Sequence, residues 1–265
     1  MNTIKRYCKI YWQIVKLNTI LLFTYRANFY NSVIISLGWG SVSVASIFLI
    51  TAKTSHIYAW SKEDLYLLAG LYSIIVGVFH MFFSSSMERF GRTISLGELD
   101  SYLLMPLNTQ LYLSTKMFRP VSILRIIIGV IFTAIIIGQL HVAIYPLTYI
   151  FFVFLIFIGI LLLYSMWFLV VTLMVWNPNL TNLIDFLYIA NNFARYPTSI
   201  ITYTRNIFLY FAIPLMLVTT VPAESILGKP NGGEVAILTF FAIGLFILSH
   251  YFWKFALTHY VSASS

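Results

Sequence analysis

Long apolar stretches separated by short polar segments run along most of this chain. Six of them cover about residues 29–52, 65–86, 120–140, 147–175, 206–222 and 235–256. A bilayer core about 30 Å thick is crossed by about 20 helical residues, so each stretch predicts a transmembrane helix. The fourth would be about 43 Å long at 1.5 Å per residue, and we expect it to tilt, bend or protrude. The pattern predicts an all-α integral membrane protein with six transmembrane helices.

The segment before the first stretch has the spacing of an amphipathic helix over residues 3–26. Tyr7, Tyr11 and Ile14 recur at helical intervals, while Lys5 and Lys9 occupy another face. A basic face beside an aromatic one suits the membrane interface, although a cytosolic helix packed on its own bundle would show the same pattern. We therefore divide the chain into an interfacial helix, residues 1–28, and a six-helix transmembrane domain, residues 29–265.

The composition excludes a soluble domain of ordinary size. The 265 residues are 60% hydrophobic and 9% charged, whereas soluble domains carry about 25% charged residues. Lipid must therefore cover most of the outer surface, and no room is left for a separate catalytic domain of about 100 residues. The single cysteine, Cys8, excludes an intrachain disulfide and a multi-cysteine metal site.

Lysine and arginine are distributed unevenly between the predicted loops. The net charge of +8 would suggest nucleic acid in a soluble protein, but here the basic residues flank apolar spans. With the N-terminus inside, the outside loops hold only Lys53, Lys62 and Lys229 of the 16 basic residues. The inside holds the remaining 13, which are Lys5, Arg6, Lys9, Lys16, Arg26, Arg89, Arg92, Lys116, Arg119, Arg125, Arg195, Arg205 and Lys254. Positive loops stay in the cytoplasm, so we expect a multi-pass protein of the plasma (inner) membrane of a prokaryote. Both termini would be cytoplasmic, with contacts to anionic lipids and none to nucleic acid.

Two inside loops are too long for simple connections. In residues 176–205, Asn177-Pro178-Asn179 marks a helix stop, and the apolar middle from Leu180 to Phe193 also carries Asp185. That middle is too short and polar for a clean span, so we interpret it as an interfacial or re-entrant helix.

The other long loop, residues 87–119, contains a short amphipathic pattern. Leu99, Leu103 and Leu107 form one stripe, Glu98 and Asp100 stand where carboxylates favour a helix N-terminus, and Pro106 limits the helix. Such a helix can dock in another protein's groove. Alternatively it lies on the membrane or packs on its own bundle.

The predicted spans contain no aspartate or glutamate. Ion-coupled carriers and ion channels usually hold charge or ordered carbonyls within the membrane, so this absence argues against both. His80 lies well inside a span and, with Ser84, could line a substrate path; alternatively it is a neutral histidine bonded between helices. Gly228-Lys229 lacks the Walker spacing, and neither a zinc-protease motif nor a nucleophile elbow is present. Uphill transport would need an energy source on a partner.

Three motifs follow one another along the chain. They are Gly97-Glu98-Leu99-Asp100 with Leu103-Leu104 and Pro106-Leu107-Asn108, then Phe193-Ala194-Arg195-Tyr196-Pro197, and then Ile213-Pro214 through Val221 to Gly228. In these motifs and in the order of its spans, the sequence resembles the permeases of ABC type-2 exporters, specifically the compact six-span kind paired with a daunorubicin-resistance-type ATPase. Met105 departs from the pattern, because the family often has a basic residue there.

The resemblance implies a permease without catalytic residues or cofactors of its own. ATP and Mg²⁺ would bind to a cytosolic ABC ATPase dimer, and a second permease, identical or homologous, would complete the transporter. The cargo would be an apolar or amphipathic substrate, such as a drug, peptide, lipid or glycan, moved out of the cytoplasm. A coupling helix between the second and third spans would contact the ATPase. The implied coupling residues are Glu88, Arg89, Phe90, Arg92, Glu98, Leu99, Asp100, Leu103, Pro106 and Leu107.

Other classes of protein remain open at this point. A non-transporting membrane subunit fits the same composition. A membrane-embedded lipid-modifying enzyme would need a polar cluster at one interface, for which His56, Glu63, Asp64 and His141 are the candidates. A secondary carrier or channel is opposed by the acid-free spans.

Overall fold

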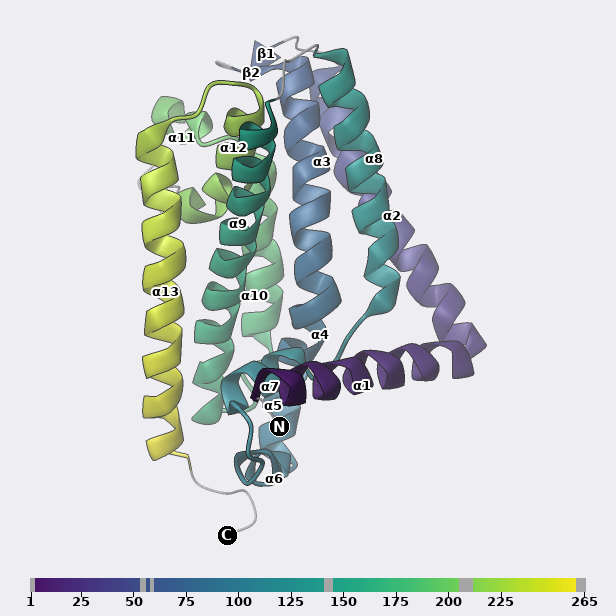
Figure 1. The fold of residues 1–265 in the computed structure, drawn as a ribbon, viewed down its shortest axis with the longest axis vertical. Helices are drawn as coiled ribbons and strands as arrows, with labels where there is room; N and C mark the ends of the chain where they lie inside the picture. Colours follow the sequence, from purple (N-terminus) through teal and green to yellow (C-terminus); the bar gives the residue numbers. More distant parts are fainter. Residues whose placement is uncertain (1–2, 53–55, 58–59, 141–144, 205–211, 261–265) are drawn as a thin grey trace.

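The structure, a computed structural model, describes residues 3–52, 56–57, 60–140, 145–204 and 212–260. These residues form a bundle of upright helices, with one helix lying across one end of it (Figure 1). We call this the α1 end and the other the hairpin end, after a short antiparallel pair of strands, β1 (His56–Ile57) and β2 (Trp60–Ser61). Lys53, His141 and Arg205 lie outside the described residues.

The helix across the end is α1 (Thr3–Thr24), followed after Tyr25 by upright α2 (Arg26–Thr51). A helix is thus present where the sequence predicted one, and one of its faces packs on the bundle. Thr115 donates a hydrogen bond to the Tyr11 hydroxyl (3.0 Å), and the Asn108 backbone amide donates to the Tyr7 hydroxyl (2.9 Å). Trp12, on another face, is exposed, which leaves an aromatic side chain for lipid.

The second span is longer than the sequence predicts. α3 (Lys62–Phe79) begins at a capping box, in which Ser61 accepts from the Asp64 amide and Asp64 accepts from the Ser61 amide. It continues through a π-helical turn, η1 (His80–Ser84), α4 (Ser85–Glu88) and α5 (Phe90–Ser95). The apolar helical run therefore extends from 62 to 95. The helix therefore continues past residue 86, and Glu88, the first charge after the apolar stretch, accepts a hydrogen bond from Tyr188.

The third span, η2 (Pro120–Ser122) with α8 (Ile123–Gln139), lies against α3. Their backbones approach closely at glycines. A Cβ atom built on Gly129 would lie 2.9 Å from both the Gly70 carbonyl oxygen and the Ile74 amide nitrogen. Only hydrogen fits there, so glycines allow the two helices to touch backbone to backbone.

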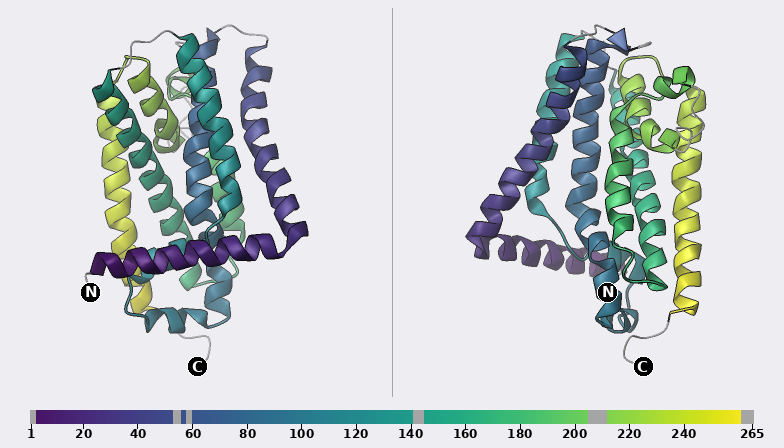
Figure 2. Two further views of the ribbon diagram at one scale, coloured as in Figure 1. Left: turned by 45° about the vertical axis from the view of Figure 1, so that its right-hand side comes forward. Right: turned by 180° about the vertical axis from the view of Figure 1, so that it is seen from behind.

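The centre of the bundle is α9 (Pro146–Thr172), prolonged by η3 (Leu173–Val175), which packs against α3, α12 and α13. The predicted long fourth span is confirmed. Trp167 and Phe168 of α9 are fully buried and contact Phe79 and Trp253 respectively. The last span is α13 (Gly232–Thr258), which ends at the α1 end, as Figure 2 also shows.

The fifth crossing differs from the prediction. Residues 206–211 of the predicted span lie outside the described residues, and the rest belongs to α12 (Ile213–Ile226), which has 14 residues. Before it come α10 (Asn182–Asn191), η4 (Asn192–Arg195) and α11 (Ser199–Thr204). α10 stands upright beside α9, while α11 and α12 lie nearer the hairpin end (Figures 1 and 2). α10 thus packs upright within the bundle, where the sequence predicted an interfacial or re-entrant helix over 180–193.

Among the described residues, five helices are long and apolar enough to cross a membrane. These are 26–49, 62–95, 120–139, 146–175 and 232–258, with α12 as a shorter apolar helix. The predicted all-helical membrane architecture is confirmed at this level, apart from the two-residue strands. The predicted fifth span, 206–222, is not among these five, because residues 206–211 lie outside the described residues and α12 has 14 residues.

The close approach of α3 and α8 predicts a sharp difference between two glycines of α8. We expect Gly129→Ala to lower the melting temperature of the purified protein by several degrees, since forcing a methyl group into a packed contact costs about 1–3 kcal/mol. Gly138→Ala is the matched control, because nothing lies within 4 Å of a Cβ there. Thermal unfolding followed by tryptophan fluorescence measures both, and equal melting temperatures would contradict the packing.

Candidate functional site

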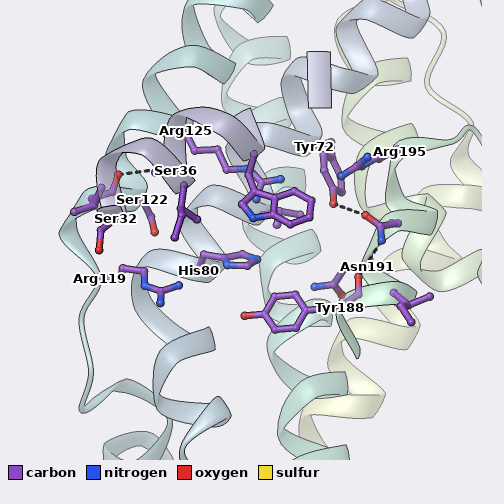
Figure 3. A pocket seen from close by; sticks show the side chains of 16 residues that line it. Ser32, Ser36, Tyr72, His80, Arg119, Ser122, Arg125, Tyr188, Asn191 and Arg195 are labelled. Atoms are coloured by element: carbon purple, nitrogen blue, oxygen red, sulfur yellow. Dashed lines mark hydrogen bonds between the residues drawn. The ribbon is translucent and has the colours of Figure 1, made fainter. Parts of the chain in front are cut away.

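A cavity of about 410 Å³ lies between α2, α3, the start of α8 and the α10–η4 segment (Figure 3). Its wall mixes apolar side chains with hydroxyls, amides and three guanidinium groups. None of the described residues that line it is an aspartate or glutamate. The polar lining residues are Ser32, Ser36, Tyr72, His80, Arg119, Ser122, Arg125, Tyr188, Asn191, Asn192 and Arg195.

Helix α3 supplies one wall by simple helical periodicity. Tyr72, Val76 and His80 are spaced by four residues, so they share one face of the helix. The π-turn begins at His80, whose ring lies 5.5 Å from the Tyr188 ring. His80 therefore lines the cavity, where the sequence placed it on a possible substrate path. Ser84 does not: it is fully buried, and its hydroxyl donates to the His80 carbonyl at 3.4 Å.

Two arginines converge on one aromatic ring. The guanidinium carbons of Arg125 and Arg195 lie 5.3 Å and 4.7 Å from the centre of the Tyr72 ring. Arg125, from the first turn of α8, is only 6% exposed. The prediction that Arg195 belongs to a cytoplasmic loop was wrong, since η4 holds it within the bundle beside α3. The Arg125 side chain also stays within the bundle, where Tyr72 and Ser43 contact it.

Hydrogen bonds fix the opposite wall. The Tyr72 hydroxyl donates to Asn192 Oδ1 (3.4 Å), and Asn192 Nδ2 donates to the Tyr188 carbonyl (3.2 Å). Trp167 Nε1 donates to Asn191 Oδ1 at 3.1 Å. The Tyr188 hydroxyl donates to a carboxylate oxygen of Glu88, which joins α10 to α4. The predicted coupling residue Glu88 is thus half-buried and already bonded within the bundle.

A second candidate region is the tip at the α1 end, formed by α5, α6 (Glu98–Leu103) and α7 (Thr109–Thr115). The predicted short helix is confirmed: it begins with Glu98 and Asp100 and ends before Pro106. Gly97 precedes it with φ of +68°, a conformation that favours glycine.

The leucine stripe of this helix follows the alternative in which it packs on its own bundle. Leu99 of the stripe is fully buried, and Leu103 packs against the bundle core, so the stripe faces inward. Leu96 and Leu104, which flank the helix, are exposed, Leu104 at 87%. Of the predicted coupling residues, Arg89, Arg92, Glu98 and Pro106 are exposed, Asp100, Leu103 and Leu107 are half-buried, and Phe90 and Leu99 are buried.

Lys116 holds the pieces of the tip together. Its ammonium group donates to Thr93 of α5 at 2.9 Å and lies 4.3 Å from the centre of the Tyr102 ring of α6. Burial lowers the pKa of the Lys116 ammonium, and the nearby Glu98 carboxylate partly offsets that effect. The tip is therefore a preformed structure, built from side chains of three short helices.

Sequence reasoning missed most of the cavity. Tyr72 and Tyr188 sit among many other aromatics in apolar stretches, so periodicity alone does not single them out. A usable signal was present in Asn191, Asn192 and Arg195, which are polar residues at helical spacing within a mainly apolar segment. No group of three or more metal-ligating side chains occurs in the part of the chain that the structure describes.

Apolar helices around a polar interior cavity define a class of protein: a multi-pass membrane protein of the transporter type. Comparison with protein families makes this specific. Residues 37–264 match the sequence model of a family described as "ABC-2 family transporter protein". The chain therefore belongs to the ABC-2 transporter family and is a membrane permease component of such a transporter. Permeases of this family are typically non-catalytic subunits that work with ABC ATPases. Comparison with curated proteins and with solved structures gives no significant match.

The bond between Tyr188 and Glu88 gives a prediction about stability. Tyr188→Phe should lower the free energy of unfolding by about 1.5–3 kcal/mol, because it removes a hydrogen bond to a charged group. Once Tyr188 is Phe, Glu88→Gln should cost less than it does alone. Melting temperatures of the two single variants and the double variant test this coupling. Tyr149→Phe, at an exposed position, is the control, and strictly additive losses would contradict the bond.

Proposed function

We propose that this permease is the membrane-spanning half of an ATP-driven exporter, which moves an apolar or amphipathic substrate out of the cytoplasm. ATP and Mg²⁺ bind to a separate cytosolic ATPase dimer. The α1 end faces the cytoplasm, with both termini there. The observation that carries the proposal is one continuous helical run, 62–95, which joins a preformed tip to an interior cavity.

The tip has the features of a docking element. Leu104 is the most exposed large hydrophobic residue among those described, and Arg89, Arg92 and Glu98 are exposed on the same tip. An exposed apolar side chain on a surface that also carries charge fits a pocket on a protein partner. Leu99 and Phe90 act from behind by fixing the tip on the bundle. The coupling face is thus proposed as Leu96, Leu104, Pro106 and the charges beside them.

A second permease fits against the open side of the cavity. α2 is the least packed of the long helices together with α13, and its apolar side chains Ile34 and Leu49 are largely exposed. On α10, Phe186 and Ile189 are exposed as well. Two copies, identical or homologous, would cover these surfaces and enclose a path between them, while lipid would cover the remainder.

ATP binding to the ATPase dimer would move the tip. Closure of the ATPase dimer would displace the docked tip, and the helix 62–95 would carry this displacement to Tyr72 and His80 on its cavity face. Such coupling needs two arrangements of the bundle that the nucleotide biases differently. The π-turn at His80–Ser84 lies between tip and cavity, where the helix can change its direction.

The lipid-modifying enzyme is less well supported by the geometry. Asp64 is engaged in the capping box of α3, and Glu63 is exposed on the first turn of that helix. A non-transporting subunit would share the fold and the tip but would give no nucleotide-dependent movement of substrate.

The proposed assembly is tested first by purification from the native host in mild detergent. We expect an ABC ATPase chain to accompany the permease in equal amounts, identified by mass spectrometry. A stable permease that carries no ATPase, and that is active alone in a membrane assay, would contradict the proposal.

The docking face is tested by Leu104→Asp. A charge placed in an apolar docking pocket should reduce the amount of ATPase retained on the permease by about tenfold or more, as is usual for a central contact residue. ATP hydrolysis by the purified complex should fall with it. Leu147→Asp, at a largely exposed position of the hairpin end, is the matched control. Equal retention in both variants would remove Leu104 from the interface.

A further inference from the structure

The interior cavity carries positive charge that nothing in its lining neutralises. Arg119, Arg125 and Arg195 line it, and no aspartate or glutamate does so among the described residues. The carboxylate of Glu88 is close by, but the Tyr188 hydroxyl engages it and Glu88 is not a lining residue. Like charges repel strongly where water is scarce. The Tyr72 ring compensates Arg125 and Arg195 only partly, through cation–π contacts.

Hydrogen-bond donors in the cavity wall also lack acceptors. Arg125 Nε, Arg195 Nε and Asn191 Nδ2 are buried without a hydrogen-bond partner among the described residues. Asn191 is 2% exposed and Arg125 is 6% exposed, so bulk water does not reach these side chains freely. Buried donors are normally satisfied, and leaving one unpaired is costly. All the fully buried, unpartnered polar atoms of the described lining residues are donors, so a ligand that satisfies them must supply acceptors.

The rim of the cavity is apolar and lies at the outer surface of the bundle. Trp39 of α2 is 56% exposed and Ile189 of α10 is 65% exposed, and both belong to the lining. A molecule with one charged end could therefore place that end against the arginines while its apolar body lies along Trp39 and Ile189. A volume of about 410 Å³ suits a headgroup with part of its body.

From these observations we infer that the cavity binds the anionic headgroup, phosphate or carboxylate, of an amphipathic molecule that enters between α2 and α10. Arg125 and Arg195 hold the headgroup through charge-assisted hydrogen bonds, and Asn191 donates a further one. The assignment of this molecule as cargo rests on the proposed export function; the binding site itself does not. A resident membrane lipid with the same headgroup chemistry would occupy the site in the same way.

Radiolabelled decyl phosphate is the probe, applied to the purified permease in a neutral maltoside detergent without nucleotide. We expect saturable binding that Arg125→Gln or Arg195→Gln weakens by about tenfold or more, as loss of a charge-assisted contact should. Arg26→Gln, at an exposed arginine of α2 outside the cavity, should leave binding unchanged. Decyltrimethylammonium, which has the same chain and the opposite charge, should not compete.

Melting profiles identify arginine variants that fail to fold. A second pair of variants, at the rim, tests the binding of an anion independently of the arginines. Ile189→Asp adds a negative charge at an exposed position, and Ile189→Asn adds a group of the same shape without charge. The aspartate should weaken decyl phosphate binding several-fold more than the asparagine. Equal binding by both variants, equal binding by wild type and the arginine variants, or no saturable binding by folded wild type would each overturn the inference.

Two further measurements separate the sources of the ligand. A native mass spectrum that shows a co-purified anionic lipid, absent from Arg125→Gln, would identify a resident lipid and support the site. Stimulation of ATP hydrolysis by decyl phosphate in the permease–ATPase complex would identify cargo and support it equally. Failure of the export proposal would appear separately, as a permease that binds decyl phosphate but carries no ATPase.

Discussion

Close backbone packing around Arg125 is the constraint on which the interior of this permease depends. A Cβ on Gly77 of α3 would lie 2.8 Å from Ile126 Cγ1, and one on Gly40 of α2 would lie 3.0 Å from Ile128 Cδ1. Both glycines also lie within 4 Å of Arg125 atoms as measured from such a Cβ. The arginine is therefore enclosed by two helices that can approach only because they carry no side chain there. With the stem fixed, its guanidinium group lies at the cavity wall, in contact with Tyr72 and Ser43.

The same packing explains how an apolar bundle tolerates this charge. Tyr72 lies on the α3 face that turns toward α8 and η4, so one ring faces a guanidinium group from each of those segments. An isolated arginine in hydrocarbon would snorkel toward the headgroups. Here the enclosing glycines prevent that, and Tyr72 of α3 and Ser43 of α2 contact the guanidinium group, which lipid could not do. Charge within the membrane is thus a consequence of helix packing, not an exception to it.

The sequence predicted those features that depend on length and local chemistry. Apolar run length located the long helices, and Glu98, Asp100 and Pro106 bounded the short helix of the tip. The fifth span was predicted at 206–222, because α10 and η4 before it are each too short to be recognised as a span. Arg195 was therefore counted as a loop charge, although η4 holds it inside the bundle. Periodicity revealed the stripe of Leu99 and Leu103 but cannot tell which partner the stripe meets. In the structure the partner is the chain's own core, and Leu104 is left outside.

The contact between Glu88 and Tyr188 connects the tip to both walls of the cavity, so a displacement of the tip would act on both. Glu88 lies on α4, between the tip and the π-turn, and Tyr188 lies on α10, so the bond joins the helical run 62–95 to the facing wall of the cavity. A displacement of the tip would therefore reach both walls: Tyr72 and His80 through α3, and Tyr188 with Asn192 through α10. If the two walls move together, the cavity shifts as a unit and its arginines keep their spacing. If the bond yields, the walls separate beside the arginines, and this is where a bound headgroup would be released. In the proposed mechanism, one carboxylate would thus link the tip to both walls, and because Glu88 does not line the cavity it would not compete for the headgroup.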